Sequence, residues 1–113
     1  MYGADIDNQI LFKDDRINTY YVDQTKEKSL KKLFKLLGNN FDLIIDDGLH
    51  SHTANLNVII NCLQFLKKGG CLVIEDISLN SKSIWETISF VTRFKYKSNL
   101  IKAKNSYVFL IFK

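Results

Sequence analysis

The sequence contains little that would support disulfide bonding, membrane insertion or a glycine-rich loop. Only two of its 113 residues are cysteines, and Cys62 and Cys71 neither form a C-x-x-C pair nor have zinc-type companions. The longest apolar runs are far shorter than a membrane span, and no signal-peptide pattern is present. None of the five glycines forms a G-x-G pattern. These absences favour a cytoplasmic protein whose cysteines are reduced core thiols.

The charge of the chain is unevenly distributed. Residues 1–60 carry seven basic and nine acidic side chains (net −2), and residues 61–113 carry nine basic and three acidic (net +6). The basic half leaves two interpretations open: a surface for nucleic acid or another anionic partner, or a solvated sheet edge. Since no Arg-rich or aromatic-basic motif accompanies the lysines, the solvated edge is favoured and nucleic acid is not expected as a partner.

Strand-like and helix-like patterns alternate along the chain. Apolar or β-branched runs predict strands over residues 2–5, 18–22, 41–46, 71–76, 98–103 and 106–113. Helical spacing predicts helices over residues 25–38, 51–68 and 83–93. Gly38 is expected to end the first helix, Gly69-Gly70 the second, and a Ser83–Glu86 capping box to open the third. This alternation predicts one α/β domain with a mainly parallel sheet and a C-terminal antiparallel hairpin.

Acidic side chains follow two of the predicted strands at the point where each strand ends. Asp46 and Asp47 come directly after LII, and Glu75 and Asp76 directly after LVI. Ligands of open α/β sheets bind beyond the carboxyl ends of the strands. If the two strands are neighbours, about 4.8 Å apart, the four carboxylates repel one another unless a cation lies among them. Mg²⁺ or Ca²⁺ suits such oxygen donors better than zinc does.

A glycine and a histidine follow the first acidic pair. Gly48 allows a sharp turn, after which His50 could point back over the site as a general base near pH 7. His52 is expected to begin the next helix and to face solvent. A purely structural interpretation stays open, because Asp-Asp-Gly and Glu-Asp also form ordinary turns and helix caps. The occurrence of both clusters in one chain favours a site.

These motifs together resemble a known family. The stretches YGADID, YYVDQ, FDLIIDDGLHSH and LKKGGCLVIEDI are similar to class I S-adenosylmethionine-dependent methyltransferases. The resemblance is to the branch with macrolide-sugar O-methyltransferases and cephalosporin hydroxylase-like proteins, which carries D-D-G-S-H and I-E-D strand ends. It covers about residues 2–78, with the final hairpin also fitting. It implies a Rossmann-like, three-layer α/β/α fold and S-adenosylmethionine as cofactor.

On the cofactor side, the resemblance implies roles for four residues. Asp5 matches the acid that accepts hydrogen bonds from the cofactor ribose, with a solvent-facing turn as the alternative. Asp23 and Gln24 match the pair beside the adenine, with a helix N-cap as the alternative for that position. Asp46 would support the site from behind or on its cofactor side.

On the metal side, the resemblance implies a magnesium site and a base. Asp47, Glu75 and Asp76 match the metal ligands, with Ca²⁺ as the alternative ion. His50 matches the base that takes the proton of the acceptor hydroxyl during methyl transfer. The ion would orient two neighbouring hydroxyls of a small polyhydroxylated substrate. Leu49 replaces the serine of the family motif, which leaves the metal and base positions intact.

The resemblance also implies that an N-terminal part is missing. The superfamily begins with a central strand and a Gly-rich loop for the methionine end of the cofactor, and residues 1–113 would be a partial domain without them. Either the strands at 2–5 and 41–46 pair directly, or a gap between them exposes backbone groups that invite pairing, including homodimerisation. Three functions stay open: an O-methyltransferase that is active or inactive as this fragment, a metal-dependent hydroxylase or hydrolase, and a basic nucleic-acid-binding module.

Overall fold

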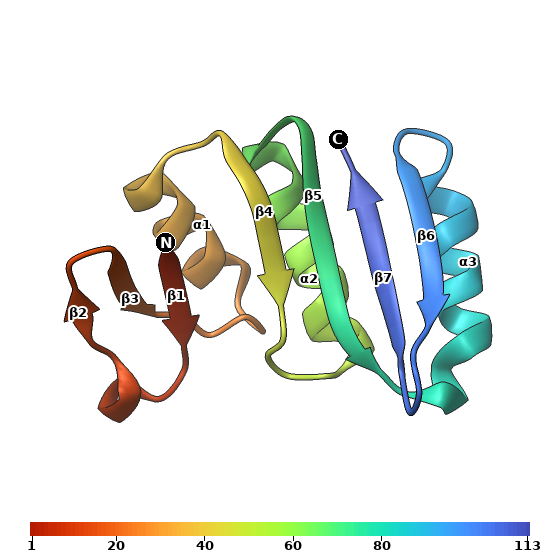
Figure 1. Cartoon of the computed structure of the whole chain (residues 1–113), viewed down its shortest axis with the longest axis horizontal. Helices are drawn as coiled ribbons and strands as arrows, with labels where there is room; N and C mark the ends of the chain where they lie inside the picture. Colours follow the sequence, from red (N-terminus) through yellow and green to blue (C-terminus); the bar gives the residue numbers. More distant parts are fainter.

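The computed structural model describes all residues 1–113 and contains two β-sheets and three α-helices (Figure 1). The strands are β1 (Tyr2–Asp5), β2 (Lys13–Asp14), β3 (Ile17–Tyr21), β4 (Phe41–Asp46), β5 (Leu66–Ile77), β6 (Lys97–Lys102) and β7 (Tyr107–Phe112). The helices are α1 (Glu27–Leu37), α2 (His52–Cys62) and α3 (Lys82–Thr92), and short 3-10 turns lie at Asn8–Ile10, Leu63–Phe65 and Leu79–Ser81. No helix combines the length and apolar character that crossing a membrane requires.

The larger sheet has the strand order β4-β5-β7-β6. β4 and β5 are parallel neighbours, with Ile44 opposite Leu72 and Asp46 opposite Ile74. β7 lies between β5 and β6 and is antiparallel to both, so it alone runs against the direction of this sheet. The predicted C-terminal hairpin and the mainly parallel arrangement are therefore confirmed.

One face of the larger sheet forms the core, and all three helices lie on that side (Figure 1). Leu72, Ile74, Phe109 and Ile111 point from β5 and β7 into this core and are completely buried. Trp85 of α3 packs on Phe109, with 5.2 Å between the ring centroids. The opposite face, which we call the open face, carries Leu43, Ile45, Val73 and Leu110 and has no helix over it. The α/β class is thus as predicted, but two layers are present where three were expected.

The smaller sheet has the order β1-β3-β2 and contributes little to the core. β1 and β3 are parallel, and the two-residue β2 pairs antiparallel with β3. No residue of these three strands is fully buried. The sheet is attached through Val22, just after β3, and through α1, whose Leu30 and Phe34 belong to the core.

The structure corrects two predicted helix boundaries. Gly69-Gly70 does not end a helix, because α2 ends at Cys62 and both glycines belong to the long strand β5. The predicted Ser83–Glu86 capping box is also wrong, since the N-cap of α3 is Ser81 and Glu86 forms an ion pair with Lys82. Gly38 does end α1, with a positive φ of 85° that glycine adopts without strain.

β1 and β4 run side by side in the same direction without pairing (Figure 1). Of the two arrangements predicted for these strands, the structure contains the gap. Tyr2 and Phe41 meet across its amino-terminal end, with 6.1 Å between their ring centroids. The unpaired edges of both strands therefore face one another.

Candidate functional site

The carboxyl ends of β4 and β5 meet at one edge of the larger sheet, because the two strands are parallel neighbours. Asp46 closes β4, Asp47 follows it, and Glu75 and Asp76 lie near the end of β5. The sequence-based expectation that the two acidic clusters share one edge is correct.

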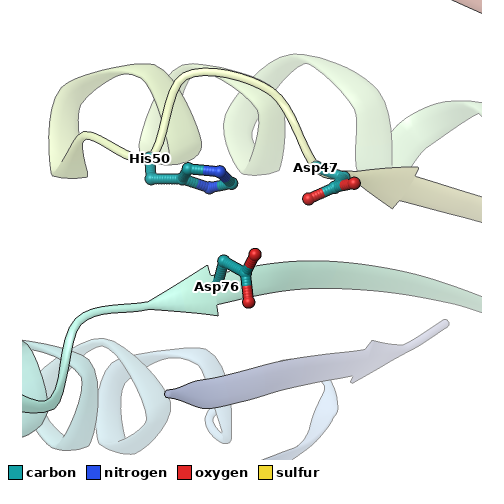
Figure 2. A group of neighbouring side chains, drawn as sticks. All are labelled: Asp47, His50 and Asp76. Carbon is teal, nitrogen blue, oxygen red and sulfur yellow. The ribbon is translucent and has the colours of Figure 1, made fainter. Parts of the chain in front are cut away.

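Three side chains converge at this edge (Figure 2). Asp47 and His50 come from the loop after β4, and Asp76 reaches towards them from β5. One donor atom from each of the three residues lies within 4.8 Å of the others, and all three side chains are exposed. We call these residues the Asp47–His50–Asp76 group.

The backbone conformation of Asp76 explains the direction in which its side chain points. Its φ is +49°, in the left-handed region that aspartate tolerates better than most residues. The regular register of β5 with β7 ends between Ile74 and Ile77, which removes Asp76 from strict strand alternation. Its carboxylate accepts one weak hydrogen bond, 3.4 Å from Ser106 Oγ, so most of its acceptor capacity faces the group.

Glu75 is not part of the group, which differs from the predicted ligand set. Ile74 points into the core, so the next residue of the strand, Glu75, points to the open face. His50 takes the third position instead. The structure therefore brings together two of the three predicted metal ligands and the predicted base.

Asp46 is buried beneath the group and holds the loop after β4. Its Oδ1 accepts hydrogen bonds from Gln24 Nε2 at 3.0 Å and from the Gly48 backbone N–H at 3.3 Å. Its Oδ2 accepts one from Asn55 Nδ2 at 2.9 Å. Gln24 Oε1 in turn accepts from the Leu49 backbone N–H at 2.7 Å. This network of neutral donors satisfies a buried carboxylate and fixes the turn that carries Asp47 and His50.

Gly48 is required for space. A Cβ atom at this position would lie 1.9 Å from Gln24 Oε1, and its φ is not positive. The expected sharp turn is present, but the close approach of Gln24 is the reason for glycine. The loop then passes into α2, whose N-cap Ser51 accepts a hydrogen bond from the Ala54 N–H at 3.3 Å. His52 begins α2 as predicted, although its side chain is half-buried and not free in solvent.

A cavity of about 320 Å³ lies between the two sheets and reaches the acidic edge. Three of the four predicted cofactor residues, Asp5, Gln24 and Asp46, line it together with Asp47. Asp5 also accepts a hydrogen bond from the Asp7 backbone N–H at 2.8 Å. Cys62 borders the cavity from α2, and burial together with the nearby charge of Asp46 raises the pKa of its thiol to about 12. Both cysteines are free thiols, but only Cys62 is buried as predicted, and Cys71 is partly exposed.

The Asp23 carboxylate contacts neighbouring residues of its own loop. Its carboxylate accepts from the Thr25 backbone N–H at 3.1 Å and hydroxyl at 2.5 Å, and pairs with Lys26 Nζ at 2.8 Å. The hydrogen bond from Lys26, with those from Thr25, lowers the pKa of Asp23 below its ordinary value. Asp23 does not cap α1 directly, since the N-cap position is Lys26.

The sequence interpretation missed Asn55. This residue is buried on α2 in line with Val58, Ile59 and Cys62, which form the core-facing stripe of that helix. A polar residue within an apolar helical stripe was the available signal, because a buried amide needs a partner. The partner is Asp46.

Comparison with known proteins identifies the family. The family model described as a methyltransferase domain matches residues 4–77, which run from the end of β1 to the end of β5 and include α1, β4 and α2. The chain belongs to this methyltransferase domain family. The matched segment contains every member of the Asp47–His50–Asp76 group and every residue predicted for the cofactor side.

Two curated relatives are O-methyltransferases of streptomycetes. The 8-demethyl-8-alpha-L-rhamnosyl tetracenomycin-C 2'-O-methyltransferase of Streptomyces olivaceus is 31% identical over 77 residues, which are 68% of this chain and 20% of that protein. Demethylmacrocin O-methyltransferase of Streptomyces fradiae is 32% identical over 77 residues, 68% of this chain and 19% of that protein. The chain therefore spans about a fifth of the length of these relatives.

Solved structures confirm the methyltransferase fold. The MycE methyltransferase of the mycinamycin biosynthetic pathway, solved with Mg and SAH, superimposes with a TM-score of 0.78 at 20% identity, covering 99% of this chain and 36% of MycE. A ribosomal RNA methyltransferase from Plasmodium falciparum gives a TM-score of 0.73 at 16% identity, covering 100% of this chain and 70% of that protein.

The chemistry of the Asp47–His50–Asp76 group fits a divalent ion. Oxygen donors bind Mg²⁺ or Ca²⁺ at roughly 2.0–2.6 Å, so donors on opposite sides of one ion lie about 4–5 Å apart. The 4.8 Å spread of the group is within that range. Two exposed carboxylates with free lone pairs suit a hard cation that also keeps several waters.

Proposed function

We propose that this chain carries the metal side and part of the cofactor side of an S-adenosylmethionine-dependent O-methyltransferase. Its acceptor would be a hydroxyl of a small polyhydroxylated molecule. The observation that carries the proposal is the Asp47–His50–Asp76 group at the strand ends of a methyltransferase domain. It is supported by MycE, a protein of the same fold solved with Mg, SAH and mycinamycin VI.

The proposed roles on the metal side follow from donor chemistry. Asp47 and Asp76 would hold Mg²⁺, with Ca²⁺ as a substitute, through one carboxylate oxygen each. When bound, the ion lowers the pKa of the acceptor hydroxyl and S-adenosylmethionine supplies the methyl group. His50 would accept the hydroxyl proton on a ring nitrogen while the carbon–sulfur bond breaks and the carbon–oxygen bond forms.

The proposed roles on the cofactor side use the cavity beneath the group. Asp5, which has one carboxylate oxygen free of backbone contacts, would accept hydrogen bonds from ribose hydroxyls. Asp23 and Gln24 would border the adenine. Asp46 would act from behind, by keeping the loop of Asp47 and His50 in place through Gln24 and Asn55.

Calorimetric titration with Mg²⁺ and Ca²⁺ tests the metal roles. We expect Asp47→Asn and Asp76→Asn each to weaken ion binding by at least about tenfold without unfolding the protein, since each removes a charged ligand and also repulsion. Asp42→Asn is the matched control. It removes another exposed charge, from the other end of β4, where Asp42 pairs with Lys67, and should leave ion affinity unchanged.

The His50→Gln variant distinguishes a role of His50 as general base from a role as metal ligand. If His50 is a base, the variant keeps ion affinity within about threefold. In a labelled methyl-transfer assay with polyhydroxylated sugars it would lose activity relative to the wild-type chain. Unchanged ion affinity in both aspartate variants, or no binding of either ion by the wild-type protein, would overturn the metal assignment.

A further inference from the structure

A basic and aromatic surface lies where α3 runs beside β6, at the outer edge of the larger sheet (Figure 1). Residues 93–97, which follow α3 and lead into β6, have the sequence RFKYK, in which cations and aromatic rings alternate. The sequence interpretation overlooked this run, and its expectation against nucleic acid rested on the absence of such a motif. We call the following residues the basic edge: Lys82, Phe90, Arg93, Phe94, Lys95, Tyr96, Lys97 and Lys102.

Two phenylalanine rings of the basic edge project into solvent. Phe90 and Phe94 are 65% and 80% exposed, whereas phenylalanine is among the residues most often buried. Their ring centroids lie 5.4 Å apart with an interplanar angle of 89°. In such an edge-to-face pair only one ring face is covered, so the other faces are available for stacking. Close by, Lys95 Nζ lies 5.3 Å from the centroid of the Tyr96 ring.

Most cations of the basic edge have no acidic partner. None of the four ion pairs of the structure includes a cation of residues 93–97 or Lys102. Glu86 is the one acid that lines the grooves at this edge, and it pairs with Lys82 at 3.3 Å. Four uncompensated positive charges therefore remain, and they attract polyanions.

A groove of about 540 Å³ runs between α3 and β6. Lys82 and Arg93 line it from the two ends of α3, Phe90 lies between them, and Lys102 lines it from β6. A second groove of about 520 Å³ also contacts Arg93 and continues along residues 94–99. The 11 residues of α3 extend about 16 Å, which corresponds to at most about five nucleotides at 3.4 Å per charge.

We propose that the basic edge binds a single-stranded nucleic acid. Phosphates would contact the four unpaired cations, and successive bases would stack on the free faces of Phe90 and Phe94. The combination carries the proposal, because exposed rings alone suit any apolar partner and cations alone suit any polyanion. β7 separates β6 from β5, so this surface is distinct from the Asp47–His50–Asp76 group and does not depend on the proposed function.

Two other occupants fit the basic edge less well. A symmetric contact with a second copy of this chain would place the four unpaired cations opposite themselves. An anionic membrane presents a flat surface, whereas these cations line a groove from both sides. The exposed side of α3 also carries the polar residues Ser83, Glu86 and Thr87, which do not favour insertion among lipid chains.

Fluorescence anisotropy with labelled eight-nucleotide oligouridine and oligothymidine tests the proposal, and a duplex of the same length is the control. We expect both single strands to bind at least about fivefold more tightly than the duplex, because paired bases cannot stack on the rings. Between about 50 and 200 mM salt, the logarithm of the association constant should fall with a slope of about −3 against the logarithm of salt concentration. This slope follows from four phosphate contacts that contribute about −0.7 each.

Matched variants separate stacking from charge. Phe94→Leu keeps an apolar side chain without an aromatic face and should weaken single-strand binding by at least about fivefold. Leu36→Ala changes an equally prominent apolar residue, 68% exposed on the lysine-rich helix α1, and should leave binding within about twofold. Arg93→Gln should reduce the steepness of the salt slope by about 0.7, and Lys32→Gln on α1 should leave it unchanged.

The proposal is overturned if neither oligonucleotide binds, if the duplex binds as tightly as the single strands, or if Phe94→Leu binds like the wild type. It is also overturned if the protein binds vesicles containing phosphatidylserine but neither oligonucleotide. NMR signals of Phe90 and Phe94 that shift with protein concentration alone would overturn it too, since a second copy would then cover the rings. Mg²⁺ titration of Phe94→Leu should match the wild type, so these results are independent of the metal assignment.

Discussion

The two sheets of this protein differ in how much each contributes to the stability of the fold. The sheet of β4, β5, β7 and β6 holds four completely buried side chains against three helices. The sheet of β1, β3 and β2 holds none, and it is attached through Val22, α1 and the Gln24–Asp46 hydrogen bond. The proposed site spans both, with the metal side on the well-packed sheet and Asp5 on the weakly packed one.

This difference in packing predicts that the two sheets affect ion binding and cofactor binding differently. The pairing of β4 with β5 in the well-packed sheet keeps the Asp47–His50–Asp76 group together. No strand pairs with the free edge of β1, so the position of Asp5 relative to that group depends on the few contacts across the gap between β1 and β4. Ion binding should therefore tolerate changes in the smaller sheet, and cofactor binding should not.

The largest expected effect is in the core of the larger sheet. Phe109→Ala should lower the free energy of unfolding by about 3–5 kcal/mol, because it leaves a cavity against Trp85. Tyr20→Ala in β3 removes a half-buried ring and should cost only about 1 kcal/mol. Urea denaturation of both variants measures the contrast. Equal losses would mean that the two sheets are equally packed.

A matched pair of glycines gives the next contrast. A Cβ atom on Gly70 in β5 would lie 2.8 Å from the Phe41 carbonyl oxygen, which the backbone holds in place. A Cβ atom on Gly3 in β1 would meet only the end of the Thr19 side chain, at 3.0 Å. Gly70→Ala should cost about 1–3 kcal/mol and Gly3→Ala less than about 0.5 kcal/mol in thermal or urea unfolding. The reverse order would contradict the description of the smaller sheet as weakly packed.

The connection between the sheets can be broken at Gly48. Gly48→Ala should displace Gln24 from Asp46 and from the Leu49 N–H, with a loss of about 1–2 kcal/mol. In a Gln24→Ala background the same change should cost almost nothing, because the clash is gone. A double-mutant cycle by urea denaturation tests this coupling, and additive losses would exclude it.

The smallest expected effect is a pH dependence at Asp23. Folding lowers the pKa of this carboxyl, chiefly through the hydrogen bond from Lys26 and then those from Thr25. The unfolded chain therefore binds the proton more readily, and the carboxylate contributes stability above its ordinary pKa that is lost as pH falls through the folded value. The stability difference between wild type and Asp23→Asn should be largest near pH 7 and vanish in acid. A difference independent of pH would show that the charge of Asp23 plays no part.

Much of the fold followed from local patterns. Residues 41–46 form β4 as their continuous apolar run predicts, but one face of the strand is exposed, whereas such a run predicts burial on both faces. The end of α2 was mispredicted because Gly69-Gly70 looks like a helix stop. What decides that position is pairing of Leu66 with Phe41 and the close approach of the Phe41 carbonyl to Gly70. Both are tertiary contacts, which no local pattern encodes.

The sequence predicted the candidate site to a similar degree. The parallel pairing of β4 and β5 brings Asp47 and Asp76 together, as the strand ends implied. The choice of Asp76 over Glu75 depends on a left-handed backbone and on the broken register with β7, which only the folded chain defines. The hydrogen bonds of Asp46 also join residues 22 and 9 positions apart in sequence, beyond the reach of periodicity.

Mn²⁺ titration followed by NMR tests the central claim most directly, since this paramagnetic ion accepts the same oxygen donors as Mg²⁺. The account predicts that low Mn²⁺ concentrations broaden the signals of Asp47, His50 and Asp76 first, and that Asp76→Asn abolishes this selectivity. Broadening that begins at Asp42 or at Asp14 and Asp15, or that spreads evenly over the exposed acids, would contradict a shared ion at the ends of β4 and β5.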